Sequence, residues 1–160
     1  MSSEGISMLI SPLSDLKALQ NLSIYYPRNN IGEQGMISLG NSLSKCLNLN
    51  KLKLDLESSQ INSKGAVGLA QDLSKSQSLQ NLTLILKNNL IDDEGLIGLG
   101  QAFANISTLR TFNISLGGNK IGFYDGSCLG VLVNCINLTS LSIDFGYKIF
   151  IQNQKNINKV

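Results

Sequence analysis

The sequence predicts an α/β solenoid, in which short parallel strands form one layer and helices form the other. Three observations lead to this fold class. A leucine-anchored motif recurs about every 30 residues, the hydrophobic period inside each motif changes from two to about 3.6, and the motifs cover nearly all of the 160 residues. One strand–helix unit cannot bury its own apolar face, so we expect the units to stack around a continuous core.

The repeating unit begins at the same leucine in each copy: Leu19, Leu49, Leu79 and Leu109, with a partial unit from Leu138. The spacings between these leucines are 30, 30, 30 and 29 residues. A half-unit over residues 4–18 precedes them, because its sequence aligns with residues 94–108. We therefore expect one repeat array over residues 1–150 and a polar C-terminal tail over residues 151–160.

The first part of each unit is predicted to be a strand, because apolar residues alternate there with period two. These residues are Leu22, Ile24 and Tyr26; Leu52, Leu54 and Leu56; Leu82, Leu84 and Leu86; Phe112, Ile114 and Leu116; and Leu141, Ile143 and Phe145. Parallel strands lie closer together than helices do. We therefore expect the array to curve into a horseshoe arc with strands on the concave face and helices on the convex face.

The second part of each unit is predicted to be a helix, with apolar residues at helical spacing such as Ala66, Leu69, Ala70 and Leu73. Residues suited to capping a helix precede these segments: Gly32, Asn62, Asp92 and Gly122. Small residues also recur on the inward helical stripe: Gly40, Ala70, Gly100 and Gly130. Because glycine lowers helix stability by about 1 kcal/mol relative to alanine, we expect a close approach there between the helix and strand layers.

The combined pattern, LxxLxLxLxxNxI followed by a glycine and spaced leucines, resembles the leucine-rich repeat of the ribonuclease-inhibitor type over residues 4–150. The strand segment is two residues longer than the usual motif. Such 30-residue units are similar to arrays abundant in ciliate proteins, some of which also contain a kinase domain. The turn asparagine of the pattern is present at Asn29, Asn89 and Asn119, whereas Ser59 and Lys148 replace it in the other units.

The resemblance implies a non-enzymatic scaffold that binds an unknown protein partner through its concave strand face. Period two assigns alternate strand residues to that face. The candidate binding residues are Asn21, Ser23, Tyr25, Lys51, Lys53, Asp55, Asn81, Thr83, Ile85, Thr111, Asn113, Ser115, Ser142 and Asp144. Tyr25 and Ile85 are the expected apolar anchors, and the second unit supplies most of the charge.

Composition argues against several other functions. The chain has no histidine, which removes the commonest general base and metal ligand, so we expect no enzyme activity, cofactor, metal or small-molecule substrate. A net charge of +2 does not favour nucleic-acid binding. No apolar run is long enough for membrane insertion, and no signal peptide is recognisable. Three cysteines without CxxC spacing fit reduced thiols, so a cytoplasmic protein is expected.

Two kinds of local feature, an acidic run and isolated cysteines, have both a functional and a structural interpretation. The acidic run Asp92–Glu94 is interpreted as helix capping rather than as a metal site, and Cys46 and Cys135 as packing rather than as nucleophiles.

Two alternative functions stay open. The chain could be a repeat segment of a larger signalling protein whose activity, for example a kinase, lies elsewhere. A less favoured alternative is activation of a small GTPase through Arg28, a loop arginine.

Overall fold

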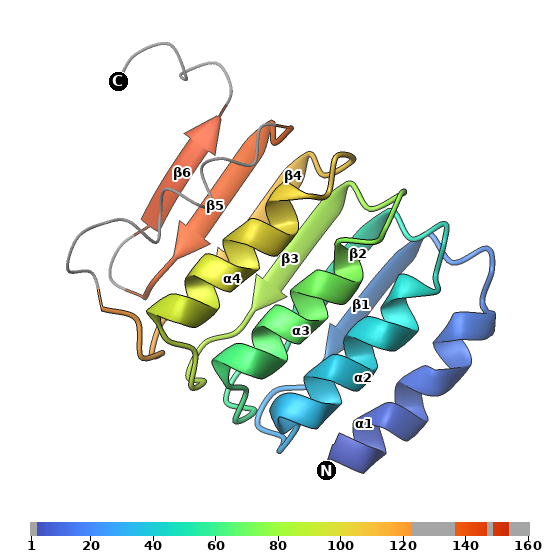
Figure 1. The fold of residues 1–160 in the computed structure, drawn as a ribbon, viewed down its shortest axis with the longest axis horizontal. Helices are drawn as coiled ribbons and strands as arrows, with labels where there is room; N and C mark the ends of the chain where they lie inside the picture. The colour runs from blue at the N-terminus through green and yellow to red at the C-terminus, as the bar shows by residue number, and fades with distance from the viewer. Residues whose placement is uncertain (1–2, 123–136, 147–148, 154–160) are drawn as a thin grey trace.

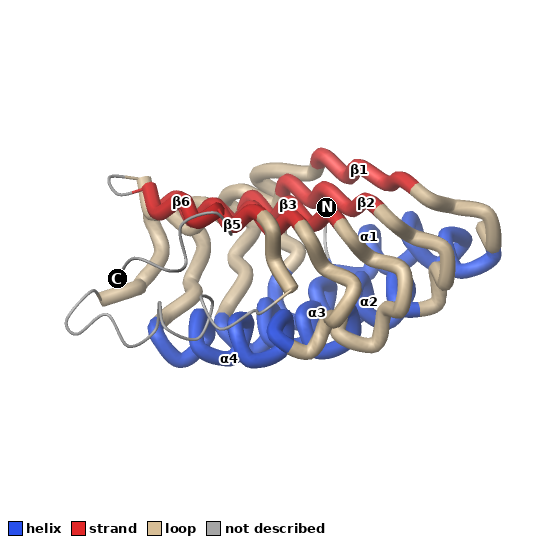
Figure 2. The backbone as a smooth tube through the Cα atoms, turned by 90° about the horizontal axis from the view of Figure 1, so that it is seen from above, coloured by secondary structure: helices blue, strands red, loops and turns tan. Residues whose placement is uncertain are grey.

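A computed structural model describes residues 3–122, 137–146 and 149–153. These residues form two layers, a sheet on one side and helices on the other (Figures 1 and 2). In chain order the elements are α1 (Ser3–Ile10), the 3₁₀ helix η1 (Ser11–Asp15), β1 (Asn21–Tyr25), α2 (Gly32–Ser44), β2 (Lys51–Asp55), α3 (Ser63–Leu73), β3 (Asn81–Ile85), α4 (Asp93–Ala104), β4 (Thr111–Ser115), β5 (Ser140–Asp144) and β6 (Ile149–Asn153).

The sheet follows the chain order from β1 to β6. Strands β1 to β5 are parallel, and each residue pairs with the residue 30 positions later, as in Leu22 with Leu52 and Leu52 with Leu82. The last parallel pair, Phe112 with Leu141, is offset by 29 residues, which matches the shorter spacing in the sequence. The repeat spacing in the sequence therefore equals the offset between paired residues of the sheet. The predicted parallel α/β arrangement is confirmed.

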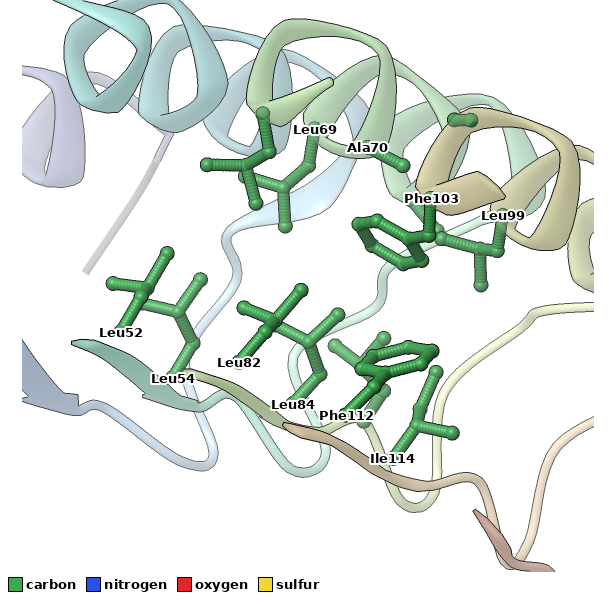
Figure 3. Packing of buried hydrophobic residues seen from close by; sticks show 14 of the residues in the cluster. Leu52, Leu54, Leu69, Ala70, Leu82, Leu84, Leu99, Phe103, Phe112 and Ile114 are labelled. Atoms are coloured by element: carbon green, nitrogen blue, oxygen red, sulfur yellow. The ribbon is translucent and has the colours of Figure 1, made fainter. Parts of the chain in front are cut away.

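The core lies between the two layers and is lined by the residues that alternate along the strands. Leu54 and Leu84 are fully buried beneath Leu69 and Leu99 of the helices (Figure 3). Between the third and fourth full units, the ring centroids of Phe103 and Phe112 lie 4.8 Å apart, with the ring planes tilted by 59°. Such a tilted pair combines apolar burial with a favourable aromatic contact.

Two of the predicted N-terminal helix caps, Asn62 and Asp92, are confirmed, whereas Gly32 is the first residue of its helix rather than the cap. The side chains of Asn62 and Asp92 each accept a hydrogen bond of 2.9 Å from the amide three residues ahead, at Gly65 and Gly95. Helix α2 instead begins at Gly32, whose φ of +60° is a left-handed conformation that suits glycine. Gly122 precedes residues that lie outside the described ones.

The inward glycines were expected to allow a close approach between a helix and the strands, and this prediction was wrong at Gly40. A Cβ atom placed there would lie 3.0 Å from the Cα atom of Leu69 and 3.0 Å from the Cβ atom of Asp72. Both neighbours belong to α3, so the close approach is between adjacent helices rather than between a helix and the strands. Gly65 repeats the arrangement, with a Cβ position 2.9 Å from the Cα atom of Glu33 in α2. Gly130 lies outside the described residues.

Two turn asparagines, the buried Asn89 and the half-buried Asn119, connect the turns of successive units. The Oδ1 atom of Asn89 accepts the amides of Ser59 and Ile61, both at 3.0 Å. Its Nδ2 atom donates to three carbonyls, of Leu56, Leu86 and Lys87, at 3.0 to 3.1 Å. Asn119 bonds the amide of Ile91 and the carbonyls of Leu86 and Leu116 in the same manner. Because buried backbone groups require partners, each asparagine joins two units.

One boundary differs from the sequence prediction. Residues 151–153, which were expected to begin a polar tail, belong to strand β6. This strand pairs with β5 in the antiparallel direction, from Ser140 opposite Asn153 to Asp144 opposite Ile149. A sixth strand of reversed direction lies outside the repeat pattern, and the periodicity therefore did not predict it. Whether the array curves into a horseshoe stays a prediction.

Candidate functional site

The outward-pointing residues of the parallel strands form a continuous surface, which we call the open sheet face. It comprises all of the predicted candidates: Asn21, Ser23 and Tyr25 on β1; Lys51, Lys53 and Asp55 on β2; Asn81, Thr83 and Ile85 on β3; Thr111, Asn113 and Ser115 on β4; and Ser142 and Asp144 on β5. Their neighbours in β2 to β5 are buried, those in β1 are partly buried, and Figure 2 shows the helices on the other side of the sheet only. The structure therefore brings the candidates together on one face.

Exposure along the open sheet face is greatest at its N-terminal end. Asn21, Ser23, Lys51 and Lys53 are exposed, whereas the outward residues of β3 to β5 are half-buried between their neighbours. Tyr25 is the most prominent apolar residue, with 77% of its surface accessible. Ile85, the other expected anchor, is half-buried. The most accessible part of the face therefore lies over β1 and β2.

A shallow depression of about 270 Å³ lies across the first three strands. Its polar lining consists of amides, hydroxyls and two ammonium groups, from Asn21, Ser23, Lys51, Lys53, Asn81 and Thr83. Such groups can donate hydrogen bonds to carboxylates and backbone carbonyls of a bound chain. The depression is open and its lining is mixed, with Leu22 and Leu52 among the polar groups, which differs from the enclosed apolar pockets that bind small molecules.

A charged cluster lies toward the other end of the open sheet face. The Oδ2 atom of Asp144 accepts a hydrogen bond from Ser115 Oγ at 2.8 Å and lies 2.9 Å from Lys87 Nζ. Its Oδ1 atom accepts the amide of Gly146 at 2.7 Å. These partners, Lys87 first, lower the pKa of Asp144 from 3.8 to about 2. The cluster holds three units together, because Lys87 follows β3 while Ser115 and Asp144 lie on β4 and β5.

This pKa predicts an acid-dependent contribution to stability. Because the pKa is lower in the folded state, the stabilisation is present above about pH 4 and is lost as the pH falls toward 2. We expect Asp144→Asn to reduce the free energy of unfolding by about 0.5–1 kcal/mol near neutral pH, a value kept small by solvent screening. Near pH 2.5 the difference in free energy of unfolding between the parent protein and Asp144→Asn should be less than half of its value at neutral pH. Urea denaturation at both pH values measures the difference, and an unchanged difference would contradict the assignment.

The other motifs have structural roles. Asp92 Oδ1 accepts a hydrogen bond of 2.6 Å from Ser63 Oγ and caps α4, and these two contacts lower its pKa. Burial raises the pKa of the Cys46 thiol, an effect that Lys17 partly opposes, so this thiol is poorly suited to act as a nucleophile. Cys128 and Cys135 lie outside the described residues.

Arg28, the candidate for GTPase activation, is exposed in the turn after β1 with a φ of +58°. Its amide donates to the carbonyl of Glu57 at 2.7 Å, which continues the pairing of β1 with β2. Within the described part of the chain, no group of three His, Cys, Asp or Glu side chains is arranged to hold a metal ion. Among the described helices, none combines the length and apolar character that crossing a membrane requires.

Solved structures share this arrangement of strands and helices. The tropomodulin C-terminal domain of Caenorhabditis elegans superimposes with a TM-score of 0.64 at 17% identity, over 91% of this chain and 84% of that one. Leiomodin-1 actin-binding site 2 superimposes with a TM-score of 0.61 at 14% identity, over 86% of this chain and 78% of that one. The fold is leucine-rich-repeat-like. No family model and no curated protein matches the sequence.

Proposed function

We propose that this chain is a non-enzymatic protein-binding module that uses the open sheet face. The observation that carries the proposal is the arrangement of that face, in which five hydrogen-bonded parallel strands hold alternate side chains outward with no described helix over them. Side chains held on paired strands lose little conformational freedom when a partner binds. The entropic cost of binding on this side of the interface is therefore small. The ribonuclease-inhibitor type of repeat and the concave shape of the face belong to the same proposal.

The chemistry of the face supports a protein partner. Tyr25 supplies a large exposed ring, while Lys51 and Lys53 supply cations beside a depression lined by amides and hydroxyls. Aromatic residues with polar surroundings are typical of protein interfaces. The similar structure of leiomodin-1 is described as an actin-binding site, so a related fold serves protein binding there. Because fold does not determine function, actin is a partner to assay rather than a conclusion.

The chemistry of the described ionisable groups also supports a binding module over an enzyme. Asp92 caps a helix, Asp144 pairs with Lys87, and the buried Cys46 has a raised pKa. General acid–base catalysis needs a group whose pKa lies near the working pH and that reaches a substrate. The alternative that the chain is one segment of a larger signalling protein is compatible with the same binding role.

The test combines three substitutions on the open sheet face, Tyr25→Ser, Lys53→Glu and Ile85→Thr. A matched control places Lys64→Glu, Gln71→Ser and Gln101→Ser on the exposed side of the helices. We expect the face variant to recover about tenfold less of the partners that the parent protein captures from a cell extract, with the partners identified by mass spectrometry. Co-sedimentation with purified actin assays one defined candidate.

Circular dichroism and thermal unfolding should show that both triple variants keep the fold. The helix-side control should capture partners as the parent protein does, because its substitutions lie on the opposite layer. Equal capture by a folded face variant would contradict binding through the open sheet face. Loss of capture by the control alone would instead assign binding to the helices.

A further inference from the structure

Strand β2 carries charges of both signs on the open sheet face, and they are separated along the strand. Its outward residues are the exposed Lys51 and Lys53 in the N-terminal half and the half-buried Asp55 at the C-terminal end. Successive outward residues of a strand lie about 6.6–6.8 Å apart, so the three charges follow one line in the order plus, plus, minus. Strand β2 lies between β1 and β3, so both of its edges are paired and only its outward side chains are open to a partner.

The two lysines at the start of this line are not neutralised by the described part of the protein. Neither Lys51 nor Lys53 forms an ion pair with a carboxylate of the described residues, whereas Lys87 lies 2.9 Å from Asp144. Two like charges about 7 Å apart repel each other, and an anion beside them is attracted by both. The pair is therefore a place on the described face where an acidic partner can bind with a favourable charge interaction.

The depression over β1 to β3 surrounds these lysines with hydrogen-bonding side chains. Each lysine has an amide or hydroxyl side chain beside it on both neighbouring strands: Asn21 and Asn81 beside Lys51, and Ser23 and Thr83 beside Lys53. The Oγ1 atom of Thr83 accepts a hydrogen bond of 3.5 Å from Asn113 Nδ2, which leaves its own O–H to donate. Within the described residues no carboxylate lines the depression. A carboxylate that enters it meets a positive charge and donors on either side.

A polypeptide in an extended conformation matches this line of charges. Its side chains on one face also recur about every 6.6–6.8 Å, so acidic residues at alternate positions can meet both lysines at once. The next alternate residue then lies over Asp55, where a basic side chain completes the charge complementarity. A polyanion such as a nucleic-acid strand would instead bring a phosphate against Asp55, and that contact between like charges is unfavourable. The order of the charges therefore favours a protein segment.

We propose that the depression binds an extended segment of a partner protein in which two acidic residues and then one basic residue occupy alternate positions. The carboxylates lie against Lys51 and Lys53, and the basic group lies against Asp55. Exposed ion pairs are individually weak, so the charges select the register of the segment, while Tyr25, paired with Asp55 in the sheet, supplies apolar contact. This inference rests on the proposed function of the open sheet face and specifies the chemistry of its partner.

The test compares two acetylated and amidated peptides of identical composition and net charge, TDTDTKT and TDTKTDT. Threonine favours the extended conformation in both. The first can place acid, acid and base against Lys51, Lys53 and Asp55, whereas the second puts its lysine against Lys53 in either orientation. We expect NMR titration of isotope-labelled protein to show saturable shifts of the β2 amide signals with TDTDTKT. The peptide TDTKTDT should bind at least about fivefold more weakly.

Two double variants assign the binding to the depression. Lys51→Gln with Lys53→Gln should weaken binding of TDTDTKT about fivefold or more, because the charges are lost while the side chains keep a similar length. Lys45→Gln with Lys64→Gln is the matched control, since it removes two exposed lysines that lie at the end of α2 and in α3. The control changes the net charge equally and should bind the peptide within about twofold of the parent protein.

Equal binding of the two peptides would overturn the proposal, because net charge alone would then account for it. So would an absence of saturable shifts at about 10 mM TDTDTKT, or tighter binding of tripolyphosphate to the same residues. Capture from a cell extract separates this inference from the proposed function. Partners that Lys51→Gln with Lys53→Gln keeps but the triple face variant loses would contradict the acidic segment alone. Equal capture by the triple face variant would contradict the proposed function as well.

Discussion

Replacement of Asn89 by alanine should lower the free energy of unfolding by about 3–5 kcal/mol. The side chain is 4% exposed and makes five hydrogen bonds to backbone groups of two units. Alanine cannot replace any of them. The amides of Ser59 and Ile61 would lose this acceptor, and each unpaired buried group costs about 1–3 kcal/mol.

The matched control is Asn41→Ala, at an exposed position of α2. Alanine is the better helix former, so this variant should be as stable as the parent protein or more stable by a few tenths of a kcal/mol. Urea unfolding followed by circular dichroism measures both. A loss below about 1 kcal/mol for Asn89→Ala would contradict a structural role for the buried amide.

The second large effect is expected at Phe103, which is 1% exposed and packs against the ring of Phe112. Phe103→Ala should reduce the free energy of unfolding by about 3–5 kcal/mol, because it leaves a cavity between α4 and β4 and removes the aromatic contact. Phe103→Leu keeps most of the apolar volume and should cost about 1–2 kcal/mol.

The pair of variants separates volume from aromatic geometry. If packing volume is the cause, stability should follow the order Phe, Leu, Ala at position 103. Thermal unfolding monitored by circular dichroism gives this order. Equal stability of the leucine and alanine variants would show that the ring contact, rather than the filled volume, determines the contribution of this residue.

The sequence predicted the repeated elements well because their cause is local. Alternation at Leu52 and Leu54 places those side chains on one face whatever the neighbouring units are, and Asn62 and Asp92 can cap only the helix that follows them. The outward residues of β1 to β5 followed from the same alternation. The 30-residue period of the sequence is the same as the offset between paired strand residues in the sheet.

The features that the sequence did not predict depend on neighbours in space. Spacing placed Gly40 on the inward stripe of a helix but could not show that α3, rather than the strands, approaches it. Asp144 was expected on the open sheet face, yet its contact with Lys87 depends on the reach of that lysine from the end of β3 to β5. Strand β6 was missed because it runs antiparallel and lies outside the repeat.

The uniform offset between paired strands also has a consequence at the level of the gene. Each full unit meets its neighbours through the same register, so an in-frame duplication or deletion of 30 codons would join surfaces that already match. Such an event changes the length of the array without changing the pairs on either side of it. The number of units is thus free to vary by recombination, while substitutions within the strands vary the residues that face outward.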